Sequence, residues 1–229
     1  MDFRFIHIYQ NTSIDSRVLA DKISKVFPSC EVDVRPAFRY DERIEQARIV
    51  DIFPPEDRPG QKRIDIVMYD GFLLQQIFGE MIPLDEASHI HVIVTGLLAC
   101  TLGQEDCRYH ARGVVCGTPS LISIPGIVEG PAKPKEFYFA QLRGISDISL
   151  KKMLAGRFID FGDTRMTSAA TLYALQALFF FVADGEPFCR DNHCSLYNAH
   201  WQEELIDLIK NGSLCDRHNL MANKFNNRK

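Results

Sequence analysis

The stretch Cys189-Arg190-Asp191-Asn192-His193-Cys194, followed after a helix-length interval by Cys215-Asp216-Arg217-His218, is the most informative part of this sequence. Thiolates and imidazoles suit tetrahedral zinc, and both spacings let one backbone turn present two ligands to one ion. Unpaired cysteines are also common in protein cores, but the paired spacing and the polar neighbours favour a metal site. We therefore predict one structural zinc ion, with ligands Cys189, Cys194, Cys215 and His218. His193 and His200 are alternatives for the fourth ligand.

Composition indicates a soluble globular protein of one domain, with a sheet-rich half (1–125) and a helical half (135–229) that holds the zinc. The 229 residues are 46% hydrophobic and 24% charged. The net charge of −4 argues against nucleic acid and anionic membranes as partners. Seven cysteines and a strand-like Met1–Tyr9 without a signal-peptide pattern predict reduced thiols in the cytoplasm. The longest apolar run, Ala169–Ala183, is too short to span a bilayer.

Strand and helix patterns alternate through the first half of the chain. Strands are expected at Phe3–Tyr9, Cys30–Arg35, Ile64–Tyr69 and Ile90–Thr95. Helices are expected from Ser13 or Asp15 to Phe27, at 41–53 and at 72–78. This order is typical of a largely parallel sheet with helical crossovers, so the predicted fold class is α/β (α+β).

The second half is predicted to be mainly helical. Two short strands, 113–116 and 121–124, flank the turn Gly117-Thr118-Pro119 and suggest a hairpin. A loop is expected at 125–134, and helices at 135–142, 149–154, 167–183 and 198–210, the last capped by Asn198. The tail after His218 is expected to be a frayed, solvated end.

The C-terminal pattern resembles that of the archaemetzincins, a family of metzincin-type zinc metallopeptidases. Their HExxHxxGxxH helix and turn run directly into Cys-x4-Cys-x-Met, and a Cys-x2-Cys pair follows. Here Cys189 and Cys194 keep their spacing, Leu196 takes the methionine place, and Cys215-x2-His218 takes the place of the last pair. Weaker similarities lie at Tyr40–Arg43 with Gln46, and at Val94–Gly96.

The resemblance implies a metzincin-like α/β fold with a mixed, mostly parallel sheet and a zinc-stabilised C-terminal helical region, in an archaeal cytosolic protein. In this register Gly185 matches the glycine of the catalytic motif. The three histidines and the general-base glutamate are replaced by Leu178, Phe179, Val182 and Phe188. These side chains can neither bind zinc nor transfer protons. We therefore expect a non-catalytic protein, with one structural zinc, that binds or regulates an unidentified protein or peptide partner.

An alternative hypothesis is a hydrolase whose active site has been rebuilt after the buried strand 90–95. Its candidate catalytic residues are His91, His110, Arg112 and Glu129, and it predicts that His110 and Glu129 lie within hydrogen-bond reach. Cys107-x2-His110 could also form half of a second metal site with Cys100 or Cys116, although the irregular spacing favours scattered structural thiols.

Other histidines and the tail give weaker signals. His89 and His91 point the same way on one strand, but the sequence offers no evident third ligand, and His7 is interpreted as a hydrogen-bonded core histidine. A zinc-stabilised nucleic-acid binder would depend on the basic tail residues Lys224, Arg228 and Lys229, and the acidic net charge argues against it.

Overall fold

The computed structural model describes residues 3–49 and 67–228. The main sheet has the strand order β2-β1-β4-β8-β7, and its strands are parallel except for the antiparallel pair β7–β8. These strands are β1 (Phe5–Tyr9), β2 (Glu31–Arg35), β4 (Ile90–Thr95), β7 (Val114–Val115) and β8 (Ser120–Ser123). The predicted α/β class, the mostly parallel sheet and the hairpin are confirmed.

A second sheet holds β3 (Met68–Asp70), β5 (Leu98–Leu102) and β6 (Tyr109–Ala111) in the order β3-β5-β6. The third predicted strand therefore does not join the main sheet, and its residues 64–66 lie outside the described residues. Strand β5 was not predicted, whereas β6 lies within the stretch Arg108–Arg112, whose alternation is compatible with a strand. Each is short, and β6 carries polar side chains, so the pairing of β5 with the distant β3 and with the neighbouring β6 defines them.

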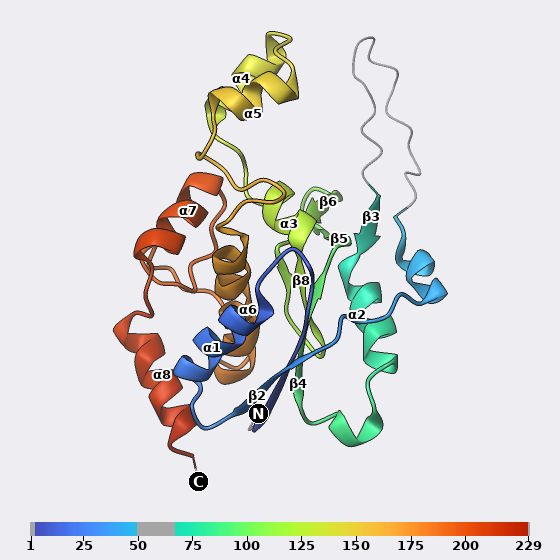
Figure 1. The fold of residues 1–229 in the computed structure, drawn as a ribbon, viewed down its shortest axis with the longest axis vertical. Helices are drawn as coiled ribbons and strands as arrows, with labels where there is room; N and C mark the ends of the chain where they lie inside the picture. Colours follow the sequence, from blue (N-terminus) through green and yellow to red (C-terminus); the bar gives the residue numbers. More distant parts are fainter. Residues whose placement is uncertain (1–2, 50–66, 229) are drawn as a thin grey trace.

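Helices cover both faces of the main sheet (Figure 1). On one face, Ile6, Ile8 and Val92 pack into a core with α1 (Ser16–Val26), α6 (Met166–Val182), α7 (Gln202–Asn211) and α8 (Asp216–Asn226). On the other, Tyr9, Ile93 and Leu121 pack with α2 (Gly71–Glu80) and the 3-10 helix η1 (Glu42–Ala47). The alternation of outward directions along each strand explains why one strand serves both cores.

Five of the predicted helices, among them α2, form close to their expected positions. Asp15 caps α1 by accepting hydrogen bonds from the backbone N–H groups of Arg17 and Val18. Helix α4 (Lys135–Leu142) has the predicted bounds, and α5 (Asp147–Met153) begins after the cap Ser146. Helix α6 ends before Asp184 and Gly185, both of which have positive φ.

Four local predictions are wrong. The segment expected to be a helix at 41–53 forms only the 3-10 helix η1, and residues 50–53 lie outside the described part of the chain. The expected loop 125–134 begins as helix α3 (Ile124–Glu129), because Pro125 stands at the helix start, where proline is tolerated. The expected frayed tail forms α8. Helix α7 starts at Gln202 rather than after Asn198, because Glu204 accepts hydrogen bonds from the backbone of His200 and Trp201.

No helix among the described residues is long and apolar enough to cross a membrane.

Candidate functional site

A compact group of thiols and one imidazole forms where the loop after α6 meets the start of α8. Cys189 and Cys194 stand at the two ends of this loop. Isolated backbone β-bridges pair Cys189 with Tyr197 and Cys194 with Ser213, and they hold the loop in place. Cys215 is the N-cap residue of α8, and His218 lies in its first turn. The two halves of the sequence pattern therefore meet as their spacing predicted.

The ligand atoms of these four residues all lie within 4.8 Å of one another. The Sγ atoms of Cys189 and Cys215 are 3.9 Å apart, and the Nδ1 atom of His218 lies 3.1 Å from Cys215 Sγ and 3.6 Å from Cys194 Sγ. Tetrahedral zinc at about 2.3 Å from each sulfur would set its sulfurs about 3.8 Å apart. The donor set and the spacings therefore fit a tetrahedral metal ion.

The cluster is closed on its inner side and partly open on its outer side. Cys194 and His218 are fully buried, whereas Cys189 and Cys215 are half-buried. Burial raises the pKa of the Cys194 thiol to about 12 and lowers the pKa of His218. Metal binding must therefore remove a proton from Cys194, and this makes the metal affinity depend on pH.

His218, rather than the two sequence alternatives, supplies the imidazole of this group. The backbone N–H of His193 donates to the Asp191 side chain at 3.0 Å within the loop. His200 lines a pocket elsewhere. Sequence spacing alone could not separate these three histidines, because the choice depends on how α8 docks.

The positions that the resemblance assigns to the catalytic motif lie along the end of α6 and beyond it. Leu178 and Phe179 are completely buried in the main core, and Val182 is half-buried against it. The Phe179 ring packs edge-on against His218, with ring centroids 5.5 Å apart. Gly185 has a φ of +91°, and Phe188 is 44% exposed. Core side chains thus fill the inner half of this region.

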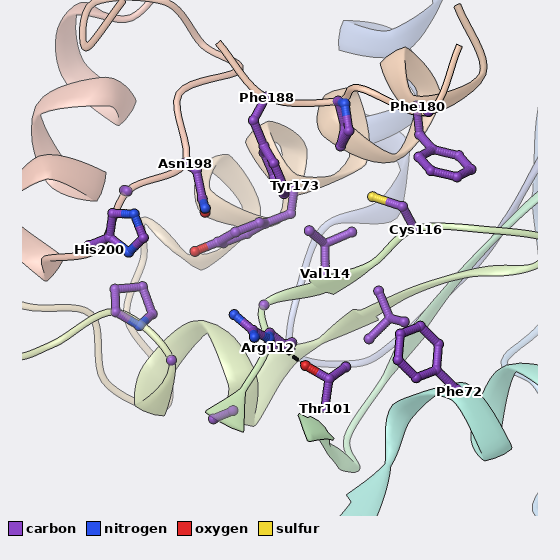
Figure 2. A pocket seen from close by; sticks show the side chains of 18 residues that line it. Phe72, Thr101, Arg112, Val114, Cys116, Tyr173, Phe180, Phe188, Asn198 and His200 are labelled. Carbon is purple, nitrogen blue, oxygen red and sulfur yellow. Dashed lines mark hydrogen bonds between the residues drawn. The ribbon is translucent and has the colours of Figure 1, made fainter. Parts of the chain in front are cut away.

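Phe188 faces a pocket of about 440 Å³ between α6, the β6–β7 region and the loops around residues 185–200. Figure 2 shows the aromatic side chains of Phe72, Tyr173 and Phe188 in its wall together with the polar groups of Arg112, Asn198 and His200. A Cβ atom on Gly113 would come within 2.6 Å of the Tyr173 ring, so glycine allows this ring to approach β7 closely. This pocket could not be predicted from the sequence, because its walls come from distant segments.

No hydrogen bond or ion pair among the described residues joins any two of the four residues of the alternative hydrolase hypothesis. His110 pairs with Asp106 at 2.9 Å, and Glu129 pairs with Lys133 at 2.9 Å. Arg112 donates to Thr101 at 2.7 Å, and His91 contacts Tyr9 and the carbonyl of Glu86. Within residues 3–49 and 67–228, neither Cys107 nor His110 belongs to a group of converging metal ligands.

The comparison with known families gives one match. Residues 2–225 match the family described as "Probable metallopeptidase family (DUF6775)". The chain belongs to this family. No curated protein and no solved structure matches the chain. The predicted relation to metallopeptidases is therefore confirmed at the level of DUF6775.

The description of DUF6775 as a probable metallopeptidase family suggests a metal ion, and the Cys/His group could bind one. Within DUF6775, this chain offers the converging ligands of the Cys/His group beside α6, and not a row of ligands on α6 itself. Leu178 and Phe179, which the archaemetzincin resemblance aligns with a histidine and the glutamate of the catalytic motif, are buried apolar residues of α6.

Proposed function

We propose that this DUF6775 member is an archaemetzincin-like, single-domain cytoplasmic protein that holds one structural zinc ion and binds a protein or peptide partner without hydrolysing it. The observation that carries the proposal is the complete burial of Leu178 and Phe179, two side chains without ligand or proton-transfer chemistry, at the catalytic positions. A catalytic zinc ion at this place would lack its first histidine and its general base.

Zinc is the metal that best matches the donor set of the Cys/His group. Three thiolates and one imidazole are soft or borderline ligands, and a tetrahedral site with four protein ligands leaves no position for a reactive water. Such an ion ties the loop after α6 to the start of α8, which supports a structural role. All seven cysteines are free thiols, a state that fits the cytoplasm.

The pocket beside Phe188 supports the binding part of the proposal. Phe72 and Phe188 are 61% and 44% exposed there, so a partner could bury apolar surface by inserting a side chain. Arg112, Asn198 and His200 add hydrogen-bond donors that could fix the orientation of a peptide carboxylate or carbonyl. We therefore propose a peptide segment with an apolar side chain as the partner.

Metal content per chain tests the structural zinc. We expect one zinc per chain, and we expect Cys194→Ser to lose it with a large fall in the melting temperature. Zinc binding to Cys/His sites contributes about 10–16 kcal/mol in peptides, which is comparable to the stability of a whole domain. Cys116→Ser is the matched control, because Cys116 is a free thiol outside the cluster. A chelated protein without zinc that melts like the untreated one would contradict the proposal.

Peptide binding and peptide hydrolysis can be measured on the same zinc-loaded protein. We expect fluorescent peptides with apolar side chains to bind intact, and Phe188→Asp to weaken this binding while zinc content stays at one per chain. Phe161→Asp is the control, since Phe161 is exposed but lies outside the pocket. Cleavage of the peptides that disappears on chelation would contradict the non-catalytic assignment.

A further inference from the structure

Two histidines and an aspartate lie side by side on the face of the main sheet that also carries Tyr9 and Ile93. His7 on β1 stands in register with His91 on β4 and with Asp33 on β2. Residues in register on parallel strands point to the same face, so these three side chains form one row. Glu86, at the end of the 3-10 helix η2 (Leu84–Glu86), reaches the same row from the segment before β4.

The ligand atoms of His7, Glu86 and His91 lie within 4.8 Å of one another. His7 and His91 are 5% and 1% exposed, whereas the Glu86 side chain is 22% exposed and forms the outer wall of the group. Two imidazoles and one carboxylate are a donor set that proteins use for divalent transition metals. The Cys/His cluster uses none of these residues.

We propose that His7, His91 and Glu86 form a second metal site, which binds a divalent transition-metal ion and is independent of the Cys/His cluster. His89 is not part of this group; His7 on the neighbouring strand and Glu86 supply the two further ligands beside His91. The interpretation of His7 as a hydrogen-bonded core residue is thereby extended to a ligand role.

The residues around His7 and His91 already orient them as ligands commonly are. His7 Nδ1 is hydrogen-bonded to the carboxylate of Asp33, which directs Nε2 towards Glu86 and Arg35. A carboxylate on the far nitrogen is a frequent partner of a metal-binding histidine. The ring of His91 is held by Tyr9 at Nδ1 and by the Glu86 carbonyl at Nε2, each at 3.1 Å. An incoming ion would replace one of these two contacts.

Arg35 supplies the positive charge in the metal-free protein. Its guanidinium pairs with both carboxylate oxygens of Glu86, the contact from Nη2 to Oε1 being 2.9 Å, and its Nη2 atom lies 3.2 Å from His7 Nε2. His89 Nδ1 also lies 2.8 Å from His7 Nε2. The Arg35 side chain is 25% exposed, so it can turn into solvent. A metal ion and this guanidinium therefore compete for the same donors.

Titration of the zinc-loaded full chain with Co²⁺ tests the site. Visible absorption and calorimetry monitor the titration. We expect d–d bands without a thiolate-to-cobalt charge-transfer band, since no sulfur contributes. Glu86→Gln and His91→Gln should abolish the bands. Asp33→Asn should weaken binding about 10–100-fold, as loss of such a supporting carboxylate does elsewhere. Arg35→Gln should tighten binding, because the competing charge is gone.

His110→Gln is the control, because His110 is an exposed histidine outside both groups of ligands. The variant should bind Co²⁺ like the natural sequence. The circular dichroism of each variant shows whether it is folded. Glu86→Gln changes the most exposed of the three ligands, so it tests the site even if His91→Gln fails to fold. Cobalt binding that Glu86→Gln leaves unchanged, a thiolate band, or no binding even by folded Arg35→Gln would overturn the proposal.

Discussion

At the scale of single residues, Arg165 fixes a loop to the start of the central helix. Its guanidinium donates to the carbonyls of Gly156 at 2.9 Å and Phe158 at 3.0 Å, and it pairs with Asp163 at 2.7 Å. The hydrogen bonds from Arg165 hold the pKa of Asp163 below its ordinary value, although partial burial acts in the opposite direction. The ionised Asp163 is therefore part of the folded structure.

Asp163→Asn should lower the free energy of unfolding near neutral pH by about 1–3 kcal/mol, the usual range for a hydrogen bond to a charged group. The folded pKa of Asp163 is depressed, so its contribution is present above the ordinary Asp pKa and is lost as pH falls through the folded pKa. Urea unfolding at several pH values measures this. Asp41→Asn, in a more exposed pair with Arg43, should have a smaller effect. An Asp163→Asn deficit that persists unchanged in strong acid would contradict the assignment.

At the scale of elements, α6 is buried on nearly all sides and connects the other parts of the main core. Its residues from Ala169 to Phe179 are all buried, and it contacts α1, α7 and α8 as well as the sheet. Thr171 and Gln176 are the polar exceptions, and the Gln176 amide donates to the carbonyl of Tyr197 at 2.9 Å. A helix with apolar side chains all round is expected in such a position.

Phe179→Glu tests whether a catalytic carboxylate could be accommodated on α6. We expect loss of folding or a fall in stability of several kcal/mol, because an unpaired charge would be buried beside the core. Phe179→Leu is the control and should cost far less, since it leaves the site apolar. Thermal unfolding compares the two variants. A stable Phe179→Glu protein would mean that this region can open to water.

At the scale of the whole molecule, the two ends of the chain share one core. Phe225 on α8 packs against Phe3 and Phe27, with ring centroids 4.6 Å and 5.6 Å apart. Figure 1 shows α8 beside α1 and near the start of β1. The proposed zinc ion would hold the first turn of α8, so its loss should be felt well beyond the C-terminal loops.

Phe225→Ala should destabilise the whole molecule by about 3–5 kcal/mol, the cost typical of a large aromatic side chain removed from a core. Leu220→Ala changes a residue of the same helix that is 60% exposed, and it should have little effect. Circular dichroism and intrinsic fluorescence should report a single shifted transition for Phe225→Ala. A shift confined to the helical half would show that α8 melts separately.

Local patterns in the sequence determined the fold class, several helices and the Cys/His ligand spacing. Helix α4 and strand β4 formed within the bounds that their residues predicted, because capping and apolar runs act over a few neighbouring positions. Helix α8 also has a local signal, because its buried residues His218, Ala222 and Phe225 follow helical spacing. Its mostly polar composition made this spacing hard to recognise in the sequence.

Only the tertiary structure decided which distant residues meet. The register of β1 with β4 places His7 beside His91, and η2 adds Glu86, although nothing in the local sequence of His7 indicates either partner. The docking of α8 selected His218 over His193 and His200 for the Cys/His group. The physical reason is that strand register and helix docking follow from burying apolar faces across the whole chain, whereas sequence periodicity reports only each segment's own faces.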